Sequence, residues 1–176
     1  MAELLQIVEK LKAKFPNGIE NVREFRGEVT VQVRPDALVE MCAFLRDDPG
    51  CRFDYLSDLT AVDWPTREKR FDLVASLYST GLRQRVRVKA RVAEGEAVPS
   101  VTGVWPASNW LEREVFDMFG ITFAGHPDLR RLLMPADWQG HPQRKDYPLE
   151  GPGEWLMESP QDWLKARQAA VEADSE

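Results

Sequence analysis

An alternating segment at 83–92 constrains the fold more than any other part of the chain. Cationic residues occupy its odd positions, and apolar residues occupy its even positions from 86 onward. A period of two places the two sets on opposite sides of a β-strand, whereas an α-helix would mix them. The segment therefore predicts a strand with one exposed side and one buried side. The cationic set is Arg83, Arg85, Arg87, Lys89 and Arg91, and the apolar set is Val86, Val88, Ala90 and Val92.

Two interpretations of the cationic side stay open. It is either a solvated sheet face, whose charges discourage aggregation through strand edges, or a docking face for an acidic partner protein. Nucleic acid is disfavoured as a partner, because no aromatic residue alternates with these charges to stack on bases. The formal net charge of −6 for 176 residues argues in the same direction.

Four further strands are expected from periodicity and turn residues. They cover residues 21–25, 29–33, 53–61 and 71–77. The first two form a hairpin that turns at Arg26-Gly27, and the short link at 79–81 favours an antiparallel hairpin into the alternating strand. In the strand at 53–61, one side is expected to carry Phe53, Tyr55, Leu59 and Ala61.

Apolar residues at three- and four-residue spacing predict about three helices. The first ends at Pro16, the second begins near Asp36, and the third covers 109–119. In the third, Asn109 and Glu112 have the spacing of a capping box, and Gly120 follows as a left-handed C-cap. Helices before, between and after strands with short links indicate an α+β fold with a mainly antiparallel sheet.

Residues 124–176 differ in character from residues 1–123. They contain six prolines and three tryptophans, and residues 150–176 carry seven acidic side chains against two basic ones. Disordered linkers are poor in aromatic residues, so we predict an extended Pro/Trp-rich arm that lies on a surface. The pattern does not distinguish a partner's surface from the chain's own sheet. We expect a core domain of residues 1–123 and an arm of residues 124–176, and contact of this arm with partner subunits is one of the two interpretations that stay open.

No constellation of residues supports catalysis. The two cysteines are too few for an iron–sulfur cluster, the two histidines lack zinc-ligand spacing, and no phosphate-binding glycine loop occurs. Arg113 and Asp117 have the i, i+4 spacing of a helical ion pair, so the charges of this helix are expected to serve structure. No apolar run approaches the ~18 residues that cross a bilayer, and a secretory signal is missing, so we expect contact with membranes only through a partner.

Residues 112–133 match a longer pattern at every defined position. The pattern is Glu-Arg-Glu, two variable positions, Asp, two apolar residues, a six-residue gap and His or Lys. After three more residues come a basic residue or Pro, one variable position and two apolar residues. The matching residues are Glu112, Arg113, Glu114, Asp117, Met118, Phe119, His126, Arg130, Leu132 and Leu133. In this pattern the chain resembles the C subunit of proton-pumping NADH–quinone oxidoreductase (respiratory complex I), the homologue of the mitochondrial 30-kDa subunit.

Two further blocks extend the resemblance over most of the chain. One covers residues 55–64, and the other begins with Leu133-Met134-Pro135 and closes with residues 144–149. The resemblance implies that the charged motif residues set helix termini and interface contacts. The interface residues expected on this basis are Glu112, Arg113, Glu114, Asp117, His126, Arg130, Arg144, Asp146 and Tyr147.

The resemblance implies a non-catalytic scaffold subunit in the peripheral arm of that enzyme. Such a chain binds no cofactor or metal itself, and FMN and iron–sulfur clusters on partner subunits carry electrons from NADH to quinone, coupled to proton translocation. The expected neighbours are the D, B and I subunits, on the cytoplasmic side of the bacterial inner membrane. Two alternatives stay open: the equivalent subunit of a related energy-converting hydrogenase or other quinone-reducing dehydrogenase complex, or a free-standing protein-binding module.

Overall fold

The computed structural model describes residues 2–149, and for residues 2–5 it describes the backbone only. Residues 1–146 form one compact unit, and a second unit begins at Tyr147. The predicted arm therefore divides: residues 124–146 belong to the compact unit, beyond the boundary expected at 123. Residues 150–176 lie outside the described residues, so contact between the arm and a partner stays a prediction.

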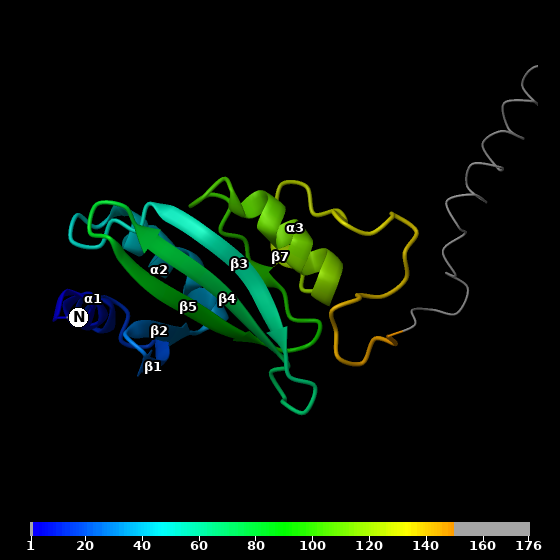
Figure 1. Cartoon of the computed structure of the whole chain (residues 1–176), viewed down its shortest axis with the longest axis horizontal. Helices are drawn as coiled ribbons and strands as arrows, with labels where there is room; N and C mark the ends of the chain where they lie inside the picture. The colour runs from blue at the N-terminus through cyan, green and yellow to red at the C-terminus, as the bar shows by residue number, and fades with distance from the viewer. Residues whose placement is uncertain (1, 150–176) are drawn as a thin grey trace, which may run out of the picture. The chain divides into compact units, whose positions relative to one another are not determined.

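A five-stranded sheet organises the compact unit, in the order β1-β2-β5-β4-β3 (Figure 1). Its strands are β1 (Ile19–Phe25), β2 (Glu28–Val33), β3 (Tyr55–Asp63), β4 (Phe71–Ser79) and β5 (Gln84–Val92). Every neighbouring pair is antiparallel except β2 and β5, which run parallel. The expected α+β fold with a mainly antiparallel sheet is confirmed.

The apolar side of the alternating strand forms the centre of the core. Its residues Val86, Val88, Ala90 and Val92 are at most 3% exposed. The helix α2 (Leu38–Asp47) follows a 3-10 turn at Pro35–Ala37 and covers this side of the sheet, and the apolar residues of α1 (Ala2–Lys14) join the same core (Figure 1). Each buried valine contributes about 1.5 kcal/mol or more to stability, so the predicted side of β5 is a main source of the fold's stability.

A third helix, α3 (Ser108–Phe119), packs against β3, and a small parallel pair joins β6 (Val98–Pro99) to β7 (Phe123–Ala124). The predicted capping box at the start of α3 is wrong, because Ala107 is the N-cap residue and its side chain makes no capping hydrogen bond. Glu112 instead points into the core and accepts a hydrogen bond from the backbone N–H of Val101 at 2.8 Å. A buried amide outside the helix competes for this carboxylate.

The predicted direction of Tyr55 is also wrong. Leu56 pairs with Leu77 and Asp58 pairs with Ser76, so Ser57 is an extra residue in β3. Such a β-bulge reverses the alternation on one side of the insertion. Leu56 is consequently buried and Tyr55 is 56% exposed on the opposite face of the sheet.

Gly120 ends α3 in the left-handed conformation, as its position predicted, with φ of 79°. A Cβ at this position would lie 2.7 Å from the imidazole ring of His141, so the residue also permits a close approach between α3 and a later segment. Gly95 has the same φ of 79°, but nothing lies within 4 Å of a Cβ built there. A comparison of substitutions at the two glycines therefore distinguishes the cost of backbone strain from the cost of a steric clash.

We predict that Gly120→Ala destabilises the protein by more than Gly95→Ala does. Both substitutions place alanine at a positive φ, at a cost of about 1 kcal/mol. Only the first also pushes the His141 ring away from the end of α3. Chemical denaturation of each variant measures the free energy of unfolding, and equal losses at the two positions would contradict the importance of the His141 contact.

Candidate protein–protein interface

Arg113 and Asp117 do not form the ion pair that their spacing predicted. Both side chains are buried in α3 and both bind the segment at 130–134 instead. Arg113 donates to the carbonyl oxygens of Arg130 and Arg131, each at 3.1 Å. The segment brings buried backbone groups against the helix, and those groups need partners more than the two side chains need each other.

Asp117 is the centre of this arrangement. Its Oδ2 accepts hydrogen bonds from three successive backbone amides, those of Leu132, Leu133 and Met134, at 3.0, 2.7 and 2.8 Å. Its Oδ1 accepts one from Arg131 Nη1 at 2.7 Å. Burial raises the pKa of the Asp117 carboxyl, but these four donors outweigh it and hold the pKa below its ordinary value. The charged carboxylate therefore organises the segment, which we call the 130–134 loop.

The last carbonyl groups of α3 also find partners in the later segment. The carbonyl oxygen of Asp117 accepts a hydrogen bond from His141 Nδ1 at 2.9 Å, and that of Met118 accepts one from the backbone N–H of Gln143 at 3.0 Å. The end of a helix leaves such carbonyls unpaired within the helix itself. Residues 141–143 thus serve as a C-cap for α3.

A second cluster of charges surrounds Arg70, just before β4. The guanidinium of Arg70 donates twice to Asp63, at 2.7 and 2.8 Å, and once to Asp146 Oδ2 at 2.9 Å. Glu94 accepts a further hydrogen bond from Arg70 at 3.2 Å and also pairs with Arg144. The pKa of the Asp63 carboxyl is lowered, chiefly by its hydrogen bonds from Arg70.

This Arg70 cluster attaches residues 144–146 to the end of β3 and the start of β4. Arg144 pairs with Asp146 at 3.2 Å, and the backbone N–H of Lys145 donates to Asp63 Oδ2 at 2.7 Å. The pKa of the Asp146 carboxyl is lowered by hydrogen bonds from Arg70 and then Arg144. The two arginines and the two aspartates thus fix the chain directly before the second unit begins at Tyr147.

The remaining predicted residues are placed separately. Burial raises the pKa of the core residue Glu112. Glu114 is half-buried, and Arg130 is exposed and pairs with Asp128 at 2.9 Å. His126 Nδ1 accepts a hydrogen bond from the backbone N–H of Asp128, so its Nε2 donates to the carbonyl oxygen of Asn109 at 3.1 Å. Tyr147 belongs to the second unit, and its interface role stays a prediction, as do those of the other residues.

Sequence reasoning missed four residues that complete these contacts. They are Arg70, Glu94, Arg131 and His141. One signal was available for the first, because Asp63 and Arg70 flank the same short turn between two predicted strands. The other three lie in loops, where no period relates a side chain to its partner.

Two large apolar side chains remain exposed beside these buried charges. Trp110 on α3 and Leu133 in the 130–134 loop are each 60% exposed. The guanidinium of Arg113 lies 4.9 Å from the centre of the Trp110 ring, which holds the indole in place. An exposed tryptophan that is held by a neighbouring guanidinium is typical of an anchor for another protein.

The charged residues of the site therefore serve to hold segments of the chain together. The buried charges of α3 bind backbone groups, and apolar side chains face outward. Among residues 2–149 no group of three or more potential ligands could hold a metal ion, and no helix is long and apolar enough to span a membrane.

Asp117→Asn is expected to lower stability and weaken its dependence on acid pH. The pKa of Asp117 is depressed on folding, so its contribution is present above the unfolded value of about 3.9 and is lost as the pH falls through the folded value. At neutral pH the loss should be roughly 3 kcal/mol, because a buried charge network is broken. Urea titrations between acid and neutral pH measure both effects.

The matched control is Asp36→Asn, which removes an exposed carboxylate paired with Arg34 at 2.6 Å. Exposed pairs contribute about 1 kcal/mol or less. Similar losses in the two variants would show that the amides of the 130–134 loop do not depend on Asp117.

Arg70→Gln is expected to loosen residues 144–146 while the sheet stays folded. The substitution removes the cation that holds Asp63 and Asp146 together, so the Lys145 amide loses a fixed acceptor. Its hydrogen exchange should become at least about tenfold faster, which corresponds to about 1.4 kcal/mol of local stability. Exchange at Val88 in β5 is the internal control. Equal acceleration at both amides would indicate global destabilisation instead.

The chain is similar to known proteins in both sequence and fold. Residues 31–153 match the family described as respiratory-chain NADH dehydrogenase, 30 Kd subunit. The C subunit of NADH-quinone oxidoreductase from Geotalea uraniireducens is 51% identical over 153 residues, which are 86% of this chain and 92% of that protein. The C subunit from Rhodobacter capsulatus is 51% identical over 152 residues, covering 86% of this chain and 76% of that one.

A solved structure agrees with these relatives. A chain of the membrane-bound sulfane sulfur reductase, an archaeal respiratory membrane complex, superimposes with a TM-score of 0.69 at 28% identity, over 82% of this chain and 85% of that chain. The family match covers more than half of the chain and includes the α3 motif and the Arg70 cluster. The chain belongs to the family of the 30-kDa subunit of respiratory-chain NADH dehydrogenase, whose bacterial members include the C subunits of NADH-quinone oxidoreductases.

Proposed function

We propose that this chain is a scaffold subunit in the peripheral arm of a proton-translocating NADH–quinone oxidoreductase. The proposal rests on the contacts that the charged residues of the family's motif make. Arg113 and Asp117 bind the backbone of the 130–134 loop, while Trp110 and Leu133 face outward. A motif used in this way shapes a surface for neighbouring chains and leaves neither of these two charges free for proton transfer.

The chemistry of the enzyme is proposed to belong to partner subunits. FMN and iron–sulfur clusters on those chains would carry electrons from NADH to quinone, and this chain would contribute no catalytic residue and bind no cofactor. Both cysteines are buried, in keeping with this assignment. Burial raises the pKa of Cys42 to about 12 and that of Cys51 to about 11, so both thiols stay protonated at neutral pH in the folded chain.

The proposed neighbours are the D, B and I subunits, on the cytoplasmic side of the inner membrane, with the membrane reached only through the complex. An outward tryptophan and leucine above a fixed loop suit a permanent protein contact, which excludes water around a few apolar anchors. Proton translocation would then be a property of the assembled translocase, to which this chain contributes position.

The alternative within the same superfamily is a subunit of another membrane-bound respiratory complex. Its support is the shared fold of the archaeal sulfane sulfur reductase chain at 28% identity. The two NADH-quinone oxidoreductase relatives are 51% identical to this chain, which favours the NADH-dependent complex.

Assembly can be tested with an N-terminally tagged chain recovered from gently solubilised native membranes. We expect it to co-purify with NADH-oxidising, quinone-reducing activity and with the flavin-bearing subunit. Recovery with a hydrogenase instead would favour the alternative, and recovery of the chain alone would refute the scaffold role.

Trp110→Ala is expected to reduce the fraction of the chain found in the complex by roughly tenfold, since buried tryptophan anchors at interfaces often contribute 2 kcal/mol or more. The matched control is Trp64→Ala. Trp64 is 41% exposed and also lies against an arginine, with Arg67 at 4.0 Å from its ring centre. Native gels of membranes from cells that express each variant measure the fraction of the chain in the assembled complex. Full assembly of the Trp110 variant would exclude this side chain as an anchor.

A further inference from the structure

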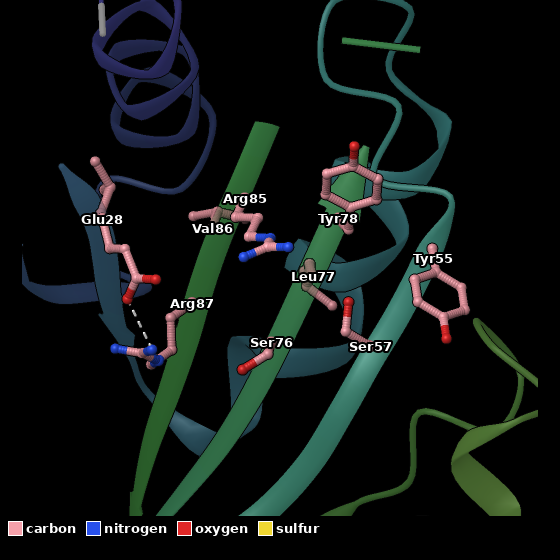
Figure 2. A pocket seen from close by; sticks show the side chains of 10 residues that line it. Glu28, Tyr55, Ser57, Ser76, Leu77, Tyr78, Arg85, Val86 and Arg87 are labelled. Carbon is pink, nitrogen blue, oxygen red and sulfur yellow. Dashed lines mark hydrogen bonds and ion pairs between the residues drawn. The ribbon is translucent and has the colours of Figure 1, made fainter. Parts of the chain in front are cut away.

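The sheet has a second face, turned away from α2, on which the cationic side of β5 lies. Figure 2 shows the side chains of Arg85, Tyr78 and Tyr55 on three neighbouring strands of this face. A groove of about 510 Å³ runs across these strands, and its lining also includes Glu28 and Arg87. We call it the Arg85 groove. Such a volume accommodates a few side chains of a bound segment.

Strand register arranges the groove as a row across the sheet. Tyr55 pairs with Tyr78, and Tyr78 pairs with Arg85. On the other side of β5, Val29 of β2 pairs with Val86, so Glu28, the residue before Val29, lies level with Arg85. Phe25 of β1 pairs with Glu28 and continues the row. Two of the aromatic rings are largely exposed, Phe25 at 58% and Tyr55 at 56%. The row thus combines aromatic surface with a central cation.

The bulge at Ser57 is what brings Tyr55 into this row. Without the extra residue, Tyr55 would lie on the same side as Leu59 and enter the core, as the sequence pattern predicted. The fold instead interrupts the β3–β4 register and leaves a large aromatic side chain in solvent. Bulges that redirect a side chain in this way are frequent at functional positions.

Not every cationic side chain of this face has a carboxylate partner. Arg87 pairs with Glu28 at 2.9 Å, and Lys89 and Arg91 both lie near the buried carboxylate of Asp72, at 3.2 and 3.7 Å. Arg85 makes no ion pair with any of residues 6–149, whose side chains the structure describes, and its guanidinium lies 5.7 Å from the centre of the Tyr78 ring. The cation is therefore oriented by an aromatic ring and available to an external carboxylate.

We propose that the Arg85 groove binds an acidic segment of another protein chain. A carboxylate of that segment pairs with Arg85, and neighbouring apolar side chains pack on Tyr55 and Tyr78. Charge complementarity selects this occupant, because an arginine held by an aromatic ring binds a carboxylate through two parallel hydrogen bonds. Nucleic acid fits less well, since the chain carries a formal net charge of −6. This inference rests on the proposed function, because the partner is expected within the assembled complex.

The test uses the full chain, with p-benzoyl-phenylalanine in place of Tyr55, in the native membrane complex. Irradiation should cross-link it to another subunit, and mass spectrometry of the cross-linked peptide should identify a segment rich in Asp and Glu. Arg85→Glu should lower the cross-link yield by roughly tenfold, the factor that corresponds to one charge-assisted contact. Lys12→Glu makes the same change of charge on α1, where Lys12 is exposed, and should leave the yield within about twofold.

Three results would overturn the inference: no cross-link at Tyr55, a cross-link to a neutral or basic segment, or a cross-link to nucleic acid, lipid or a second copy of this chain. Native gels run in parallel keep the two proposals apart. An assembled complex without the cross-link refutes only the acidic partner, whereas absence of the chain from the complex refutes the scaffold role and this inference with it. Thermal unfolding of Arg85→Glu verifies that the exposed substitution leaves the fold intact.

Discussion

One buried carboxylate determines how the 130–134 loop packs on α3. Asp117 accepts hydrogen bonds from three successive backbone amides and one guanidinium, which hold the loop against the helix. A charge that is fully removed from water must be compensated, and four donors compensate it here. The loop in turn leaves Leu133 exposed, and Trp110 on α3 is exposed to the same extent.

The Arg70 cluster applies the same principle to the end of the compact unit. Asp63 and Arg70 flank the turn between β3 and β4, and they bind residues 144–146 through side-chain and backbone contacts. Two segments without regular structure are thus fixed by charged groups, the 130–134 loop on α3 and residues 144–146 on the sheet. A protein that positions other chains needs rigid loops, and buried ionic contacts supply that rigidity where apolar packing is sparse.

Local periodicity was sufficient for the three helices and the five strands of the large sheet. It was insufficient for the short strands β6 and β7 and for the partners of the charged residues. The Arg113–Asp117 pair, the capping role of Glu112 and the direction of Tyr55 were each inferred from sequence spacing, and each was wrong. In the first two cases, backbone groups from elsewhere in the chain outcompeted the local partner. For Tyr55, one inserted residue shifted the strand register, and the pattern of side chains in β3 does not predict this shift.

The sequence by itself determined the α+β architecture, the buried side of β5, the left-handed turn at Gly120 and the family to which the chain is similar. These features depend on residues close together in the chain, whose periods and backbone preferences are local. Only the tertiary structure decided that Asp117 binds the 130–134 loop, that Arg70 holds residues 144–146, and that Arg85 lies against an aromatic ring without an ion pair among residues 6–149. Such arrangements involve residues far apart in sequence, and their free energy depends on burial, which exists only once the chain has folded.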